Sequence, residues 1–145
     1  MRKDERGSAL VELAITLPLL LLVSVGIFEF GRAFQTWQVL TNAAREGARV
    51  AVLPNSDPAN VESRVRQYMQ DGQLGMYSAA SVAVNNDATV SIGTGTVSAS
   101  QVTVVYPFNF MVLNPIAKLV VPNSTLGGAA ISMTAAAAMR NESPN

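Results

Sequence analysis

The stretch that decides the fold is Gly7–Phe28, "GSALVELAITLPLLLLVSVGIF", which follows the charged opening "MRKDER". The sixteen residues from Leu13 to Phe28 carry no charge, and as a helix they would be about 24 Å long. That length falls short of the ~30 Å hydrocarbon core of a bilayer. If Glu12 were neutralised or paired, the apolar helix would begin at Ser8 and reach roughly 31 Å. The sequence therefore predicts a membrane-spanning helix whose length depends on the state of Glu12.

The helical pattern continues beyond the apolar stretch through "FGRAFQTWQVLTNAAREGARVAVL". Spacings of four and three place a stripe of side chains on one face, namely Phe30, Phe34, Trp37, Thr41, Ala44, Ala48 and Ala51. No turn signal interrupts the pattern, so we expect a single helix of roughly 45 residues from Ala9 to about Leu53. We expect its first half to contact lipid and its second half to pack against protein. The same part of the helix carries a row of small residues, Ala43, Gly47 and Ala51. Such a row lets another backbone approach closely, either a sheet of the same chain or a neighbouring copy.

A second helix and a set of strands are expected after the break at "PNSDP". The helix has Asp57 as N-cap, Pro58 at its first position and Gly72 past its end. Its apolar face consists of Val61, Val65 and Met69, with Tyr68. Alternating and β-branched residues in "SVAVNNDATVSI", "SQVTVVYPF" and "AAISMTAAAAMR" predict strands, with a turn at residues 85–87. The apolar segment 108–121, "FNFMVLNPIAKLVV", is either a buried connection or an exposed patch that docks on a partner or on the membrane surface.

Composition excludes several classes of function. The chain of 145 residues has ten Lys and Arg, ten Asp and Glu, and neither cysteine nor histidine. Its balanced, scattered charge lacks the basic footprint of a nucleic-acid-binding surface. The usual zinc ligands and imidazole catalysts are missing, and Asp57, Asp71 and Asp87 lie in cap or turn contexts. We therefore expect a protein that is not an enzyme, with no metal, cofactor, nucleic acid or small-molecule substrate.

The stretch Arg6–Leu53 resembles the TadE-like pseudopilins of the tight-adherence (Flp-type) pilus system. The resemblance rests on "TLPLLLL" with Pro18, "FEFGRAF" with Glu29 and Arg32, and "LTNAAREGARVAV", while "VTVVYPF" and "MTAAAAMR" match more loosely. It implies a precursor in the bacterial inner membrane that a prepilin peptidase cuts between Gly7 and Ser8. It further implies a minor pilin or pseudopilin that helps to initiate or assemble the pilus with other pilus or pseudopilin subunits. Leu13 replaces the aromatic residue that often follows the glutamate in related major pilins.

Cleavage at that site would give Glu12 a partner. The new ammonium group of Ser8 would lie one helical turn away, and the helix N-terminus would also favour a carboxylate nearby. We expect Glu12 to pair with this amine in its own chain or in an adjacent subunit, which would fix the axial register of a helix in lipid. The alternative is that Glu12 lies at the level of the lipid headgroups.

Two further features of the long helix carry predictions. Pro18 removes a backbone donor and clashes with the carbonyl of Ala14, so we expect a bend or loosening there. Glu29 and Arg32 are three residues apart and are expected to pair at the outer interface of the membrane.

The predicted organisation has three parts: a cytoplasmic leader (1–7), a transmembrane half-helix (8–31) and an extracytoplasmic, pilin-like α+β domain (32–145). In that domain the long helix and a short one pack on an antiparallel sheet of three or four strands. Arg2, Lys3 and Arg6 favour a cytoplasmic N-terminus, with the domain periplasmic or extracellular, although arginines after the span weaken this bias. Two rivals stay open: a soluble secreted protein cut after Gly26, and a membrane-anchored binding module.

Overall fold

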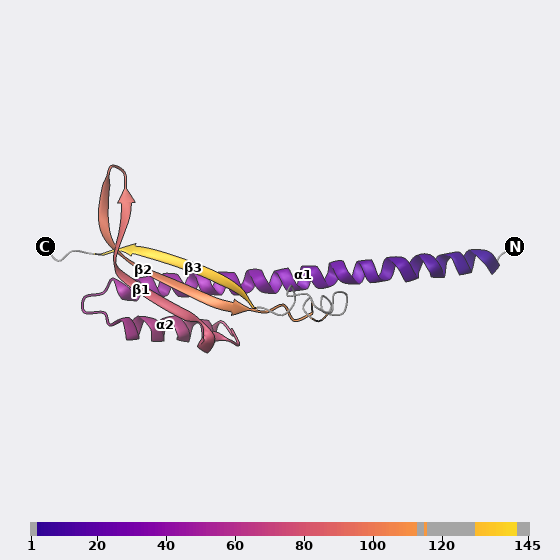
Figure 1. Cartoon of the computed structure of the whole chain (residues 1–145), viewed down its shortest axis with the longest axis horizontal. Coiled ribbons are helices and arrows are strands. Elements are labelled where there is room, and N and C mark those ends of the chain that lie inside the picture. Colours follow the sequence, from indigo (N-terminus) through magenta and orange to yellow (C-terminus); the bar gives the residue numbers. More distant parts are fainter. Residues whose placement is uncertain (1–2, 113–114, 116–129, 142–145) are drawn as a thin grey trace. The chain divides into compact units, whose positions relative to one another are not determined.

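The structure is a computed structural model that describes residues 3–112, 115 and 130–141, with side chains described from residue 7 onward. Figure 1 shows its elements along the chain: α1 (Lys3–Ala51), α2 (Pro58–Asp71), the 3-10 helix η1 (Tyr77–Ala79), β1 (Ser81–Ile92), β2 (Gly95–Phe108) and β3 (Ile131–Arg140). The chain divides into an N-terminal unit, Met1–Ala33 with Phe110–Ala129, and a C-terminal unit, Phe34–Asn109 with Ala130–Asn145. The predicted α+β, pilin-like fold class is confirmed.

The long helix α1 is continuous over 49 residues, as predicted, but it begins at Lys3 rather than Ala9 and ends at Ala51 rather than Leu53. Its hydroxyl side chains do not interrupt it, because they donate to carbonyl oxygens of the preceding turn. Thr16 Oγ1 lies 2.8 Å from the oxygen of Glu12, and Thr41 Oγ1 lies 2.9 Å from that of Trp37. Such bonds satisfy the hydroxyl within the helix itself, so these residues do not require water or a second partner.

Helix α2 forms where its capping residues predicted it. The Asp57 carboxylate accepts a hydrogen bond of 3.0 Å from the backbone N–H of Ala59, and Pro58 occupies the first turn. Three residues of the predicted apolar face are buried, namely Val61, Val65 and Met69, and Tyr68 is half-buried. At its end, a Cβ added to Gly72 would lie 2.6 Å from Cγ1 of Val39, so the glycine permits the close approach of α1 and α2.

Small side chains on α1 form the centre of the C-terminal unit. Ala43, Ala44 and Ala48 are fully buried. A Cβ added to Gly47 would lie 2.5 Å from Cγ2 of Val65 on α2 and 3.2 Å from Cγ1 of Val102 on β2. Gly47 therefore lies where two helices and the sheet meet, and the small-residue row serves packing within the chain.

The aromatic part of the predicted stripe does not belong to this core. Phe30, Phe34 and Trp37 are 65%, 60% and 46% exposed, although Ala44 and Ala48 of the same stripe are buried. The buried positions in this part of α1 are instead Glu29, Ala33, Thr36 and Leu40. The prediction followed the largest apolar side chains, whereas the buried side chains belong to a neighbouring stripe of the helix.

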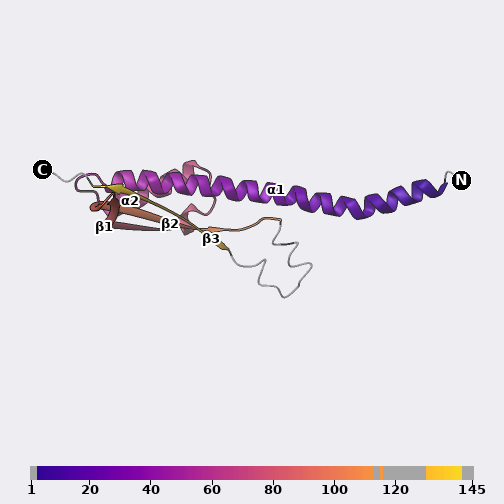
Figure 2. The ribbon, with the colours of Figure 1, turned by 90° about the horizontal axis from the view of Figure 1, so that it is seen from above.

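The sheet has three antiparallel strands in the order β1-β2-β3. Alternate residues of the central strand β2 are buried; they are Ser100, Val102, Val104, Tyr106 and Phe108. Figure 2 shows the strands on one side of the layer that α2 and the C-terminal part of α1 form. The strand predicted for "AAISMTAAAAMR", despite its alanines, is confirmed over Ile131–Arg140, and Ala135 is buried; residue 129 lies outside the described part.

The predicted turn at residues 85–87 is wrong. These residues form an irregularity inside β1, where the pairing with β2 shifts register between Asn85 and Ala88. The Asn85 side chain accepts a 3.0 Å hydrogen bond from the N–H of Asp87, the same local bonding that favours turns. The true turn follows Ile92, which pairs with Gly95, and uses Gly93 at a φ of +61°.

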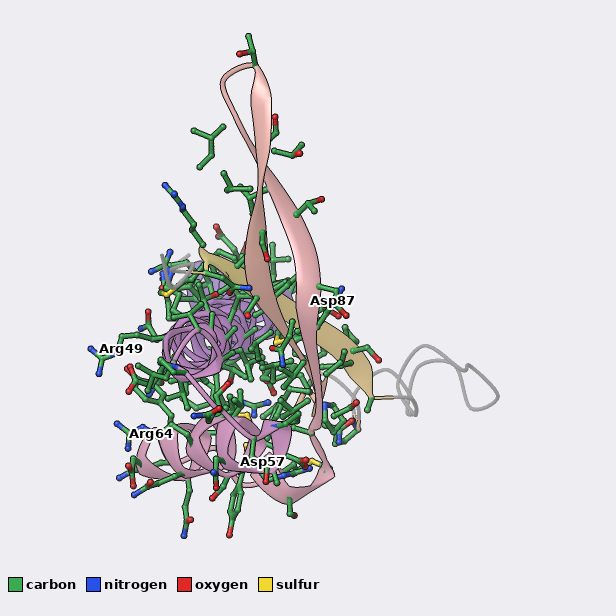
Figure 3. All side chains as sticks on the ribbon, turned by 90° about the vertical axis from the view of Figure 1, so that its left-hand side faces the viewer. Arg49, Asp57, Arg64 and Asp87 are labelled. Carbon is green, nitrogen blue, oxygen red and sulfur yellow. The ribbon has the colours of Figure 1, made fainter. Side chains whose placement is uncertain are left out.

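Beyond this irregularity the hairpin of β1 and β2 is largely exposed, and Figure 3 shows it extending past the labelled Asp87 and away from the helices. Asn141, which follows β3, holds the base of the hairpin. Its side-chain oxygen accepts a 2.8 Å hydrogen bond from the buried hydroxyl of Ser100, and its backbone N–H donates to the carbonyl of Ser98 at 3.0 Å. The sheet thus stays ordered at the point where its register changes.

The packing at Gly47 gives a stability prediction. Gly47→Val should lower the stability of the C-terminal unit by about 2 kcal/mol, because the added atoms overlap Val65 and Val102. In thermal unfolding of the full chain in detergent this corresponds to a Tm lower by roughly 10 °C. Gly31→Val is the matched control, since it makes the same change in α1 where a Cβ meets nothing within 4 Å. Equal melting of the two variants would contradict the packing described here.

Candidate functional site

The apolar half of α1 has no cover within the described chain. Every residue from Gly7 to Ser24 is exposed, including the large side chains of Ile15 and Leu20. α1 is long and apolar enough to cross a membrane, and none of its most apolar stretch is buried. A core helix of a soluble protein would be mostly covered. Exposure of so large a continuous apolar surface to water is unfavourable and marks a site that a partner or a membrane covers. This half of the helix is therefore consistent with a single membrane span.

The three residues predicted for processing and pairing lie together in the first turns of this helix. Ser8 and Glu12 are one turn apart and share a face. Both side chains are exposed. A Cβ added to Gly7 would meet nothing within 4 Å, so packing within the described chain does not require a glycine there. The cleavage site at Gly7 and Ser8 and the pairing of Glu12 remain predictions.

Pro18 lies inside α1, and the helix assignment continues through it. Its missing N–H removes the usual donor to the carbonyl of Ala14. Two residues earlier, the Thr16 hydroxyl donates to the carbonyl of Glu12 at 2.8 Å and approaches that of Leu13 at 3.4 Å. The predicted bend or loosening at Pro18 remains a prediction.

Glu29 is the buried acid of the N-terminal unit, with no exposed surface. Its Oε2 lies 2.9 Å from Nη2 of Arg32, and its Oε1 accepts a hydrogen bond from the backbone N–H of Val112. A buried carboxylate needs such partners, because an unpaired one loses its hydration without compensation. The spacing of the sequence pointed to Arg32. It gave no signal for Val112, which is 83 residues away.

A second contact joins the same two segments. The rings of Phe30 and Phe110 meet edge to face, with centroids 6.1 Å apart and planes at 70°. Next to this pair, Met111 is 66% exposed and Val112 is 37% exposed. Residues 110–112 therefore lie along the C-terminal end of the apolar half-helix and present apolar side chains. Of the predicted apolar segment 108–121, residues 113–114 and 116–121 lie outside the described part.

Within the described residues, no group of three His, Cys, Asp or Glu side chains could hold a metal ion. The buried Glu29 is occupied by an arginine and a backbone donor. In this arrangement the acid holds two segments together. The site therefore consists of the exposed apolar surface of α1 and of the contact between Glu29–Phe30 and Phe110–Val112.

The long helix α1 also carries the likeness to known proteins. Residues 7–49 match the family model described as TadE-like protein. The predicted resemblance is confirmed over this TadE-like segment, which begins at Gly7, includes Glu12, Pro18, Glu29 and Arg32, and ends two residues before α1 does. The chain has no match among curated proteins and none among solved structures.

The contact at Glu29 can be measured directly. Glu29→Ala should speed amide hydrogen exchange at Val112 roughly tenfold or more, because the N–H loses a hydrogen bond to a charged acceptor. Glu29→Gln keeps a side-chain oxygen at the same place and should speed exchange much less. Glu62→Ala is the control, since it removes another paired acid, the partner of Arg66 on α2. Unchanged exchange at Val112 in Glu29→Ala would show that the contact does not protect this amide.

Proposed function

We propose that the chain is a non-catalytic, single-span subunit of a tight-adherence pilus apparatus in the bacterial inner membrane. It acts as a minor pilin or pseudopilin that helps to initiate or assemble the pilus with other pilus subunits. One observation carries the proposal: the TadE-like match falls on a helix whose apolar half has no cover within the described chain. The N-terminus faces the cytoplasm, and the C-terminal unit lies outside it.

The proposal differs from a secreted protein cut after Gly26 in what happens to the apolar half-helix. Such a cut would remove residues 7–26, nearly half of the matched segment. The match runs without a break across Gly26 to residue 49, and α1 is helical throughout. Both observations favour a mature chain that keeps the span.

Processing between Gly7 and Ser8 belongs to the same proposal. A glycine inside a helix costs about 1 kcal/mol relative to alanine, and nothing in the described chain packs against Gly7. A requirement from outside the chain accounts for it, namely a peptidase site that admits only a small side chain before the cut bond. Gly26 and Gly31 are equally open, so it is the position of Gly7, five residues before Glu12, that marks it.

Glu12 then has a role in assembly. In the precursor it is an acid within an exposed apolar helix. After cleavage the ammonium group of Ser8 supplies an opposite charge one turn away, in the same chain or in a neighbouring subunit. Pairing lets the apolar helix begin at Ser8, and so gives it the length that the bilayer requires.

The cleavage step is tested by Gly7→Leu, which should leave a precursor in the membrane that is longer than the wild-type product by the leader. Gly31→Leu is the matched control, because it changes another open glycine of α1 and should be processed normally. Mass spectrometry of the membrane-extracted protein distinguishes the two products. Normal processing of Gly7→Leu would place the cut elsewhere.

The pairing step is tested by Glu12→Gln, which keeps the shape of the side chain and removes its charge. This variant should insert and be cut, because glutamine lowers the cost of insertion. Assembly should fall, as measured by cross-linking between subunits and by the number of pili on cells, and Glu12→Asp should restore part of it. Glu62→Gln on α2 controls for the loss of an acid elsewhere. Full assembly by Glu12→Gln would return Glu12 to the role of an acid at headgroup level.

A further inference from the structure

The feature that the proposed function does not use is the segment Phe110–Val112. It begins two residues after β2 ends and belongs to the N-terminal unit together with the apolar half of α1. No Asp, Glu, Lys or Arg occurs between Phe108 and Leu113. An exposed apolar segment beside an apolar helix needs a covering partner.

The contacts of this segment fix its level along α1. From Ser8 to Glu29 the helix rises about 32 Å, which matches the ~30 Å hydrocarbon core. Glu29 and Phe30 therefore mark the outer end of the proposed span. The N–H of Val112 donates to Glu29, and the ring centroids of Phe110 and Phe30 are 6.1 Å apart.

One backbone donor of the segment, the N–H of Val112, is satisfied within the protein. An irregular segment at membrane depth is tolerated only where its polar groups find partners in the protein. The N–H of Val112 donates to the buried carboxylate of Glu29, and the charge of that carboxylate is balanced by Arg32 at 2.9 Å. The donor of Val112 is therefore satisfied without solvent, whereas a water-exposed loop has no need of a buried acid as its acceptor.

The side chains complete the argument. Met111 and Phe30 are 66% and 65% exposed, and Ile27 and Phe28 on the preceding turn are exposed as well. The apolar surface of the segment thus continues the lipid-facing surface of the helix. We propose that Met111 and Val112 enter the outer interfacial layer of the bilayer, where acyl chains of phospholipids cover them. This inference rests on the proposed function, because it requires that α1 spans the membrane.

The test uses the full chain in vesicles of phosphatidylethanolamine and phosphatidylglycerol that include acyl-brominated phospholipid. Trp37 is the single tryptophan, so Trp37→Phe gives a background free of indole fluorescence. Met111→Trp or Val112→Trp then places a reporter in the segment. Leu20→Trp reports the span, and Ile92→Trp, an exposed apolar position at the end of β1, is the matched control.

We expect bromine to quench Met111→Trp to about half the extent of Leu20→Trp or more, as for side chains at the boundary of headgroups and acyl chains. Ile92→Trp should not be quenched. Adding Glu29→Ala to Met111→Trp should reduce its quenching, and Glu29→Gln should reduce it less.

Three results would overturn the inference. Quenching of Leu20→Trp without quenching of either segment reporter would remove it and leave the membrane span intact. Absence of quenching in Leu20→Trp would remove the span of the proposed function, and the inference with it. Emission of Met111→Trp that shifts with the protein-to-lipid ratio and resists bromine would show that a second copy of the chain covers the segment.

Discussion

A single uninterrupted helix has to satisfy two surroundings, and the size of its side chains determines which part belongs to which. From Gly7 to Ser24 all residues of α1 are exposed, and most of them are large and apolar. From Ala43 to Ala51 the inward residues are alanine or glycine, and Gly47 leaves room for Val65 and Val102 at once. Larger residues here would hold α2 and the sheet away from the helix, because close-packed interiors do not absorb added volume.

Glu29 lies between the exposed apolar part of α1 and its closely packed part, and it contributes polar contacts. It is buried, and its two carboxylate oxygens have different partners: a side chain of its own helix and a backbone donor from the segment after the sheet. Each bond alone would leave part of the buried carboxylate without a hydrogen-bond partner among these groups. The acid therefore determines which piece of backbone can lie against α1 at this level.

Much of the fold could be predicted because its signals are local. The cap of α2 at Asp57, the apolar period of Val61, Val65 and Met69, and the continuity of α1 each depend on residues within a few turns. The strand 131–140 followed from its period of two, although its alanines favour helix. The failures also have local causes: "NND" bonds to its own backbone in a bulge as readily as in a turn, and Gly93 forms the turn instead.

The candidate site was predictable only in part, for a physical reason. Spacing along a helix predicted that Glu29 would meet Arg32, since such neighbours lie on one face. It could not predict the bond to Val112, because no periodic pattern links residues so far apart in the chain. The exposed ring of Trp37 was misassigned for a related reason: a helical period places apolar side chains on one face, and it does not report whether another part of the chain covers each position.

The order of the strands has a consequence for how the chain is made. The central strand β2 pairs with β3 along one edge, and β3 comes from residues 131–140, the last strand in the described part of the chain. Until those residues have been synthesised, β2 offers an open edge of β-branched residues, of the kind that promotes association between chains. A product that ends before Ile131 would carry that edge together with the exposed apolar half of α1. Interrupted translation would therefore yield aggregation-prone fragments.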